Sequence, residues 1–126
     1  MTGKITVGTI QDTDGNTVAS TYVTNGVAKA WAYIEGTGTP SITGSFNISG
    51  LTDEATAVVR ANFTNNMNNT NFSNLGVPRE NSEVVMIQEL ESTYVRATSS
   101  MVLKTHSTTA SVDTQGRNYA VLGDLA

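Results

Sequence analysis

The sequence has no cysteine, a single histidine and few charged residues, and each shortage excludes a class of protein. Without cysteine, neither a disulfide framework nor a thiolate metal site can form. The net charge of −4 disfavours nucleic acid as a partner, because phosphates select a basic surface. No stretch approaches the roughly 18 apolar residues of a membrane-spanning helix, and the first residues lack the apolar run of a secretory signal. We therefore expect synthesis in the cytoplasm, no membrane insertion and no nucleic-acid partner.

Small polar residues take the place of the missing charge. Threonine, serine, asparagine and glycine make up 54 of the 126 residues. Threonine favours strands because it is branched at Cβ, whereas glycine and asparagine favour turns because they tolerate positive φ. The composition thus predicts many short strands joined by tight turns, in a chain whose length fits one main domain.

The first 27 residues predict an arm built from a β-hairpin. Lys4 to Ile10 and Thr17 to Val23 have the composition of strands, and Asp12 to Asn16 has the composition of a turn. Asn25 and Gly26 form a second turn signal. Apolar residues are sparse here and an isolated hairpin is marginal in water, so we expect the arm to pack on the main domain or on another subunit.

Residues 28–126 predict an all-β domain, an antiparallel β-sandwich of jelly-roll type. The spacing of about 8 to 12 residues between strand patterns is typical of such folds. Among the expected strands are Ala28 to Glu35, apolar on both faces, and a pair formed by Glu83 to Glu91 and Tyr94 to Thr98. Four aromatic residues are the candidate core or oligomer contacts, with Trp31 expected in the core: Trp31, Tyr33, Phe46 and Phe63.

Several ordered blocks resemble a module found in bacteriophage tail fibres and small virion structural proteins. Its "AKAW…GTGT" pattern matches Gly26 to Thr39, and its "SFNxS" strand matches Ser45 to Ser49. Its "Ile/Leu-Thr-Asp" turn matches Leu51 to Asp53. Its "NFT" strand matches Ala61 to Met67, and Asn71-Phe72 stands where the module has Asn-Tyr. The likeness covers about residues 26 to 73 and is weaker beyond.

The resemblance implies a non-enzymatic protein of the virion surface, made in the host bacterial cytoplasm and assembled as a homotrimer. Two roles stay open, a tail-fibre-like knob for host attachment and a capsid decoration, cement or head-fibre protein bound to the major capsid protein. A tail-associated polysaccharide hydrolase is a third, less favoured role. The resemblance supplies no catalytic residue and no cofactor.

The segment from Asn62 to Asn74 holds seven asparagines in thirteen residues. Side-chain amides both donate and accept hydrogen bonds, so they suit sugar hydroxyls or contacts between subunits. A surface turn is the simpler interpretation. The candidate receptor or subunit contacts are Asn65, Asn66, Asn68, Asn69 and Asn71.

Three other patterns contain residue types that are found in metal or catalytic sites, but each has a simpler explanation. Asp12 to Asn16 lacks the loop spacing of a calcium site and fits a hairpin turn. His106 has no partner in the sequence for a triad or zinc site, although a trimer could bring three copies together. Glu89 and Glu91 would repel each other on one strand face and fit a solvated edge better than a hydrolytic pair. We therefore expect no metal site and no catalytic site.

Overall fold

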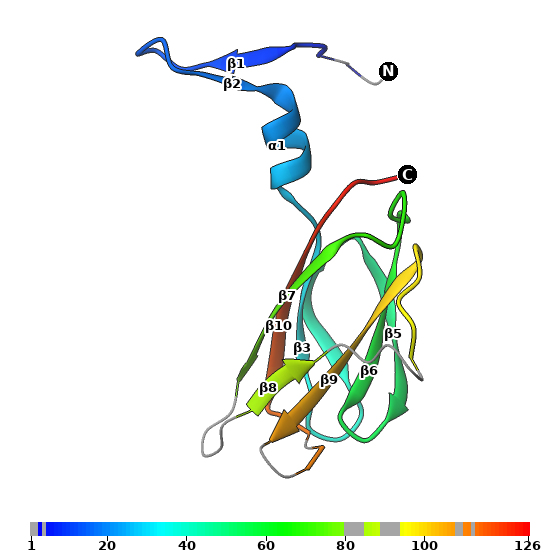
Figure 1. Cartoon of the computed structure of the whole chain (residues 1–126). Coiled ribbons are helices and arrows are strands. Elements are labelled where there is room, and N and C mark those ends of the chain that lie inside the picture. Colours follow the sequence, from blue (N-terminus) through cyan, green and yellow to red (C-terminus); the bar gives the residue numbers. More distant parts are fainter. Residues whose placement is uncertain (1–2, 4, 80–84, 89–93, 108–109, 112) are drawn as a thin grey trace.

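The computed structural model describes residues 3, 5–79, 85–88, 94–107, 110–111 and 113–126. These residues form an all-β, antiparallel structure with one short helix (Figure 1). Sheet I has the strand order β4-β3-β10-β7 and sheet II the order β5-β6-β9-β8. The strands of sheet I are β3 (Ala28–Glu35), β4 (Ser41–Phe46), β7 (Ser73–Arg79) and β10 (Gly116–Leu122). Those of sheet II are β5 (Ile48–Ala55), β6 (Val58–Phe63), β8 (Val85–Gln88) and β9 (Ser100–Ser107).

The two sheets share one hydrophobic core, as the alternation of side chains along each strand requires. Sheet I contributes alternate residues of β3 and β10, and sheet II contributes alternate residues of β6 and β9. The buried cluster comprises Ala30, Ala32, Ile34, Val59, Ala61, Phe63, Met67, Phe72, Met101, Leu103, Tyr119 and Val121. The expected sandwich-like, all-β character is therefore confirmed. This strand order, with hairpins between consecutive strands in both sheets, does not confirm a jelly-roll connection.

A separate arm precedes β3. Strands β1 (Thr9–Gln11) and β2 (Thr17–Ala19) pair as a hairpin, and helix α1 (Ser20–Gly26) follows directly. No residue from 5 to 26 is buried. Figure 1 shows the arm standing away from the sandwich, beyond the end where the C-terminus lies.

The helix corrects the expected strand from Thr17 to Val23, which ends at Ala19. Because β1 has only three residues, the chain beyond Ala19 has no strand beside it in the described part of the arm. The Ser20 N–H still donates to the Gly8 carbonyl, and beyond it the backbone forms helical hydrogen bonds, which end with the Val27 N–H on the Val23 carbonyl.

The expected strand from Tyr94 to Thr98 is also wrong. Only Ala97 makes an isolated bridge there, to Ser100, and β8 pairs with β9 instead. The backbone of this segment is used elsewhere, because the Met67 N–H donates to the Thr98 carbonyl at 2.8 Å. The segment is therefore tied to the asparagine-rich loop and not to a neighbouring strand.

Candidate interaction surfaces

The outer face of sheet I is apolar and exposed. Strand register places Phe46, Trp31, Ala120 and Leu75 side by side in one row across the four strands. The next row holds Gly44, Tyr33, Asn118 and Val77. The exposed fractions of the four large side chains are 45% for Trp31, 53% for Phe46, 57% for Leu75 and 65% for Val77. Exposed apolar side chains are ordinary when scattered, but a contiguous patch marks an interaction site.

The structure divides the four aromatic candidates between the core and the outer face of sheet I. Phe63 lies in the core, in edge-to-face contact with Phe72 at 5.8 Å between ring centres. Trp31 and Phe46 lie outside the core, so the expectation that Trp31 is a core residue is wrong. The inward face of β3 is filled by small side chains of Ala30 and Ala32, which leaves the large odd-numbered residues pointing outward.

A shallow hollow of about 290 Å³ lies in the middle of this face. The Trp31 ring leans over Gly44 and the Tyr33 ring over Gly116, where an added Cβ would lie 3.6 Å and 2.9 Å from the nearest ring carbons. Among the described residues, no Asp, Glu, His, Lys or Arg side chain lines the hollow. Such a surface is suited to burying apolar groups of a partner.

Charges of opposite sign flank the apolar rows. In the third row Glu35 of β3 and Arg79 of β7 lie on either side of Gly116. Arg79 donates to the Tyr33 hydroxyl at 2.9 Å, and this hydrogen bond is the main reason that the pKa of Arg79 is raised. Both charges therefore lie at the third-row end of the face, with Glu35 carried by β3 and Arg79 carried by β7 but reaching across β10 to Tyr33.

The outer face of sheet II carries polar side chains that bond to one another, and its two valines, Val58 and Val102, are buried. Arg60 makes an ion pair with Glu54 and donates to the Ser100 hydroxyl at 3.2 Å. Asn62 donates to the Thr52 hydroxyl, also at 3.2 Å. Arg60 and Asn62 thus find their partners within the same face.

The five asparagine candidates are all exposed, in the loop between β6 and β7. The Asn65 amide is held by Asn47, and the Asn69 side chain accepts from the Asn71 N–H at 2.8 Å. The side-chain amides of Asn66, Asn68 and Asn71 make no hydrogen bond to the described residues. They are therefore available to a partner.

The loop lies at the arm end of the sandwich. The Asn68 N–H donates to the Asp124 carbonyl, the Ala126 N–H donates to the Asn66 carbonyl, and Met67 bridges to Leu125. Arg96 clasps the loop, since it donates to the Thr70 and Phe72 carbonyls and covers the Phe72 ring. The free amides therefore project from a firmly held backbone, next to the C-terminal residues.

Asn47, which the sequence interpretation passed over, is the corner between the two sheets. It stands alone between β4 and β5 with φ of 57°, a conformation that asparagine tolerates better than most residues. Its amide donates to the Lys29 and Asn65 carbonyls at 3.0 Å, and its side-chain oxygen accepts from the Asn65 N–H at 2.7 Å. The sequence signal for this corner was an asparagine that stands between two strand patterns.

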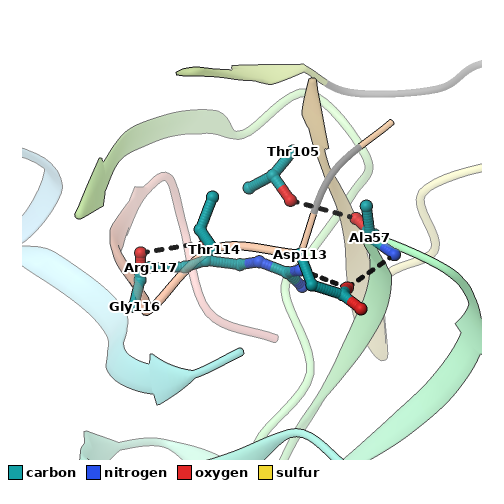
Figure 2. Close-up of polar contacts among 6 residues, drawn as sticks. All are labelled: Ala57, Thr105, Asp113, Thr114, Gly116 and Arg117. Carbon is teal, nitrogen blue, oxygen red and sulfur yellow. Dashed lines mark hydrogen bonds and ion pairs between the residues drawn. The ribbon is translucent and has the colours of Figure 1, made fainter. Parts of the chain in front are cut away.

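The opposite end of the sandwich contains a buried arginine. Arg117 is fully buried and forms an ion pair of 3.5 Å with Asp113, whose side chain also accepts from the Ala57 N–H at 2.8 Å (Figure 2). Burial lowers the pKa of Arg117, against the attraction of Asp113. Thr114 is buried beside it and donates to the Gly116 carbonyl. These contacts join the β5–β6 turn to the segment before β10, so we assign the cluster a role in stability.

The remaining candidates do not form a site in the described residues. Asp12 accepts from the Asp14 and Asn16 N–H groups at 2.9 Å, which confirms the hairpin turn. His106 lies in β9 with its ring beside the Ser107 carbonyl. Glu89 and Glu91 lie outside the described residues. Within the described part of the chain, no three His, Cys, Asp or Glu side chains are grouped to hold a metal, and no helix has the length and apolarity to cross a membrane.

No protein-family model, curated protein or solved structure matches this chain. Its function must therefore be argued from the two outer faces, the arm and the asparagine-rich loop.

Proposed function

We propose that this chain is a non-enzymatic structural protein of the bacteriophage particle surface, a homotrimeric, tail-fibre-like knob for host attachment. One observation supports it most: the domain carries a contiguous apolar outer face, and residues 5–26 of its arm include no buried residue. Both features belong to a protein that completes its structure by association. The sequence blocks from Gly26 to Phe72 supply the phage assignment.

Host attachment is assigned to the exposed amides of the asparagine-rich loop, which can exchange hydrogen bonds with sugar hydroxyls. The test is a glycan array probed with the wild-type chain and with a variant in which Asn66, Asn68 and Asn71 are replaced by alanine. Asn69 is left intact, because its side chain holds the Asn71 N–H. We expect the variant to lose glycan binding while its thermal unfolding stays unchanged. Equal binding by both proteins would remove the loop from the receptor site.

A capsid decoration or head-fibre role is the second candidate, and the arm favours it. A projecting hairpin and helix with exposed Ile10, Tyr22 and Val23 are suited to docking on another virion protein. The asparagine-rich loop lies at the same end, where it could contact that protein or a sister copy instead of a receptor. Copy number in purified particles separates the two roles, because a decoration protein is present in far more copies than a tail fibre.

A further inference from the structure

We propose that the outer face of sheet I is a contact surface between copies of this chain, with the aromatic side of one copy against the aliphatic side of another. The inference rests on the proposed function, since it names the surface through which the copies associate. The occupant of the hollow is thus a second copy of this chain.

The distribution of side chains on this face supports a second copy of the chain as the molecule that fills the hollow. Phe46 and Trp31 stand on β4 and β3, whereas Leu75 and Val77 stand on β7. Between them β10 presents only Ala120 and Asn118, so the centre is low and the sides are high. The raised side of one copy can therefore enter the hollow of another, in a contact that buries aromatic rings against aliphatic groups.

The charges on the borders support the same pairing. Glu35 stands on β3, on the aromatic side, and Arg79 stands on β7, on the aliphatic side, from which its side chain reaches the Tyr33 hydroxyl. When unlike sides of two copies meet, Glu35 of one copy comes to the side that carries Arg79 of the other. A surface that carries both halves of a complementary charge pair is suited to itself, and charge complementarity of this kind fixes partner and register.

The size of the face indicates that the contact has a second part. Four strands about 4.8 Å apart and three rows of side chains give a patch of roughly 400 Å². A stable interface buries about 800 Å² on each partner. The arm offers further exposed apolar side chains, Tyr22, Val23 and Val27 among them, so we assign the second part of the contact to the arm.

The direct test compares two substitutions of one residue type. Val77 on the face is 65% exposed and Val95, away from it, is 62% exposed. We expect Val77→Lys to weaken association by about tenfold or more, because it places a charge in an apolar contact. Val95→Lys should associate like the wild type. Sedimentation velocity over a range of concentrations measures both, and circular dichroism verifies that both variants fold.

A mixing experiment tests the charge pairing between copies. Glu35→Arg and Arg79→Glu should each associate more weakly than the wild type, because each variant brings like charges together. An equimolar mixture of the two variants should associate more strongly than either alone. Restoration by mixing can arise only between chains, so an internal Glu35–Arg79 attraction would not produce it.

Each outcome bears on a different claim. A dimer whose assembly is broken by Val77→Lys would keep this inference and overturn the trimer. An assembly equally strong in Val77→Lys and the wild type would overturn this inference and leave the trimer standing. A chain that stays single at every concentration would overturn both. A Val77→Lys variant that loses glycan binding but not association would overturn this inference alone.

Discussion

The two outer faces of the sandwich differ although the two sheets share one core. Sheet II carries Arg60 and Asn62 outward, and these side chains bond to neighbours on the same face. Sheet I carries Trp31 and Val77 outward, with no such partners for their apolar surface. A polar, internally bonded face is complete in one copy, whereas an apolar face gains free energy only when a partner covers it. This contrast is the reason that we propose association through sheet I and not through sheet II.

Core substitutions should have the largest effect, and the same effect in both sheets. Ile34→Ala in sheet I and Leu103→Ala in sheet II each empty a buried position and should cost about 3 kcal/mol of unfolding free energy. Val77→Ala should cost less than about 0.5 kcal/mol in a single copy, because its side chain is exposed. Urea denaturation at low protein concentration measures all three. A core-sized loss for Val77→Ala would mean that the face is covered within one chain.

The corner between the sheets should respond next most strongly. Asn47→Ala removes the side-chain hydrogen bonds and places alanine at φ of 57°, so it should cost about 2 to 3 kcal/mol. Asn47→Gly keeps the backbone conformation accessible and should cost about 1 kcal/mol less. Thermal unfolding of the two variants measures the difference. Equal losses would show that the hydrogen bonds alone explain this position.

The two outer faces should respond differently to protein concentration. Arg60→Ala breaks contacts within one face and should lower stability by about 1 kcal/mol at every concentration. Trp31→Ala should have a small effect in dilute solution and a growing one as concentration rises, because association stabilises only the wild type. Melting temperatures at two widely separated concentrations check this. If the losses in melting temperature of the two variants depended on concentration in the same way, the proposed difference between the faces would be wrong.

A smaller effect is expected for a polar group inside the core. The Tyr119 hydroxyl is buried without a hydrogen-bond partner among the described residues, and burial raises its pKa. Tyr119→Phe removes this hydroxyl and should leave stability unchanged or raise it by up to about 1 kcal/mol. The free energy of unfolding decides it. A loss above that size would reveal a hydrogen bond that the hydroxyl makes in solution.

The smallest effect concerns the hairpin of the arm. Hydrogen bonds from Asn16, followed by those of the neighbouring N–H groups, hold the pKa of Asp12 below its usual 3.8. A group with a lowered pKa in the folded state stabilises that state above its unfolded pKa, and the contribution is lost as pH falls. We expect the turn to loosen below about pH 4. The amide NMR signals of Asp14 and Asn16 report it, and Asp12→Asn, which has no carboxyl to titrate, serves as control.

The sequence predicted the all-β fold because the composition and the period of two both act locally. Alternation along β3 placed Trp31 and Tyr33 on one face and Ala30 and Ile34 on the other. Because both faces of this strand are apolar, the sequence predicted burial on both sides and Trp31 in the core, whereas only the face of Ala30 and Ile34 is buried. Which face is buried depends on the opposing sheet, whose Met101 and Leu103 fill the space over the small alanines.

The site was less predictable than the fold. The asparagine candidates share a loop, but their place beside the C-terminus depends on long-range backbone hydrogen bonds that no local pattern encodes. The apolar row of Phe46, Trp31 and Leu75 comes from three strands and depends on their register. Helix α1 was missed because its residues have strand-like composition, while its conformation is set by the short partner strand before it.

Trp31, the only tryptophan of the chain, permits the most direct test of the apolar face. In a single copy its side chain is 45% exposed, and in the proposed contact it is covered. Tryptophan fluorescence of the wild type should shift to shorter wavelength, and its quenching by acrylamide should fall, as the protein concentration rises through the range in which the sedimenting mass increases. In Val77→Lys the emission should stay at its dilute value over the same range. An assembly that forms while the emission and quenching of Trp31 remain those of the single copy would contradict the account.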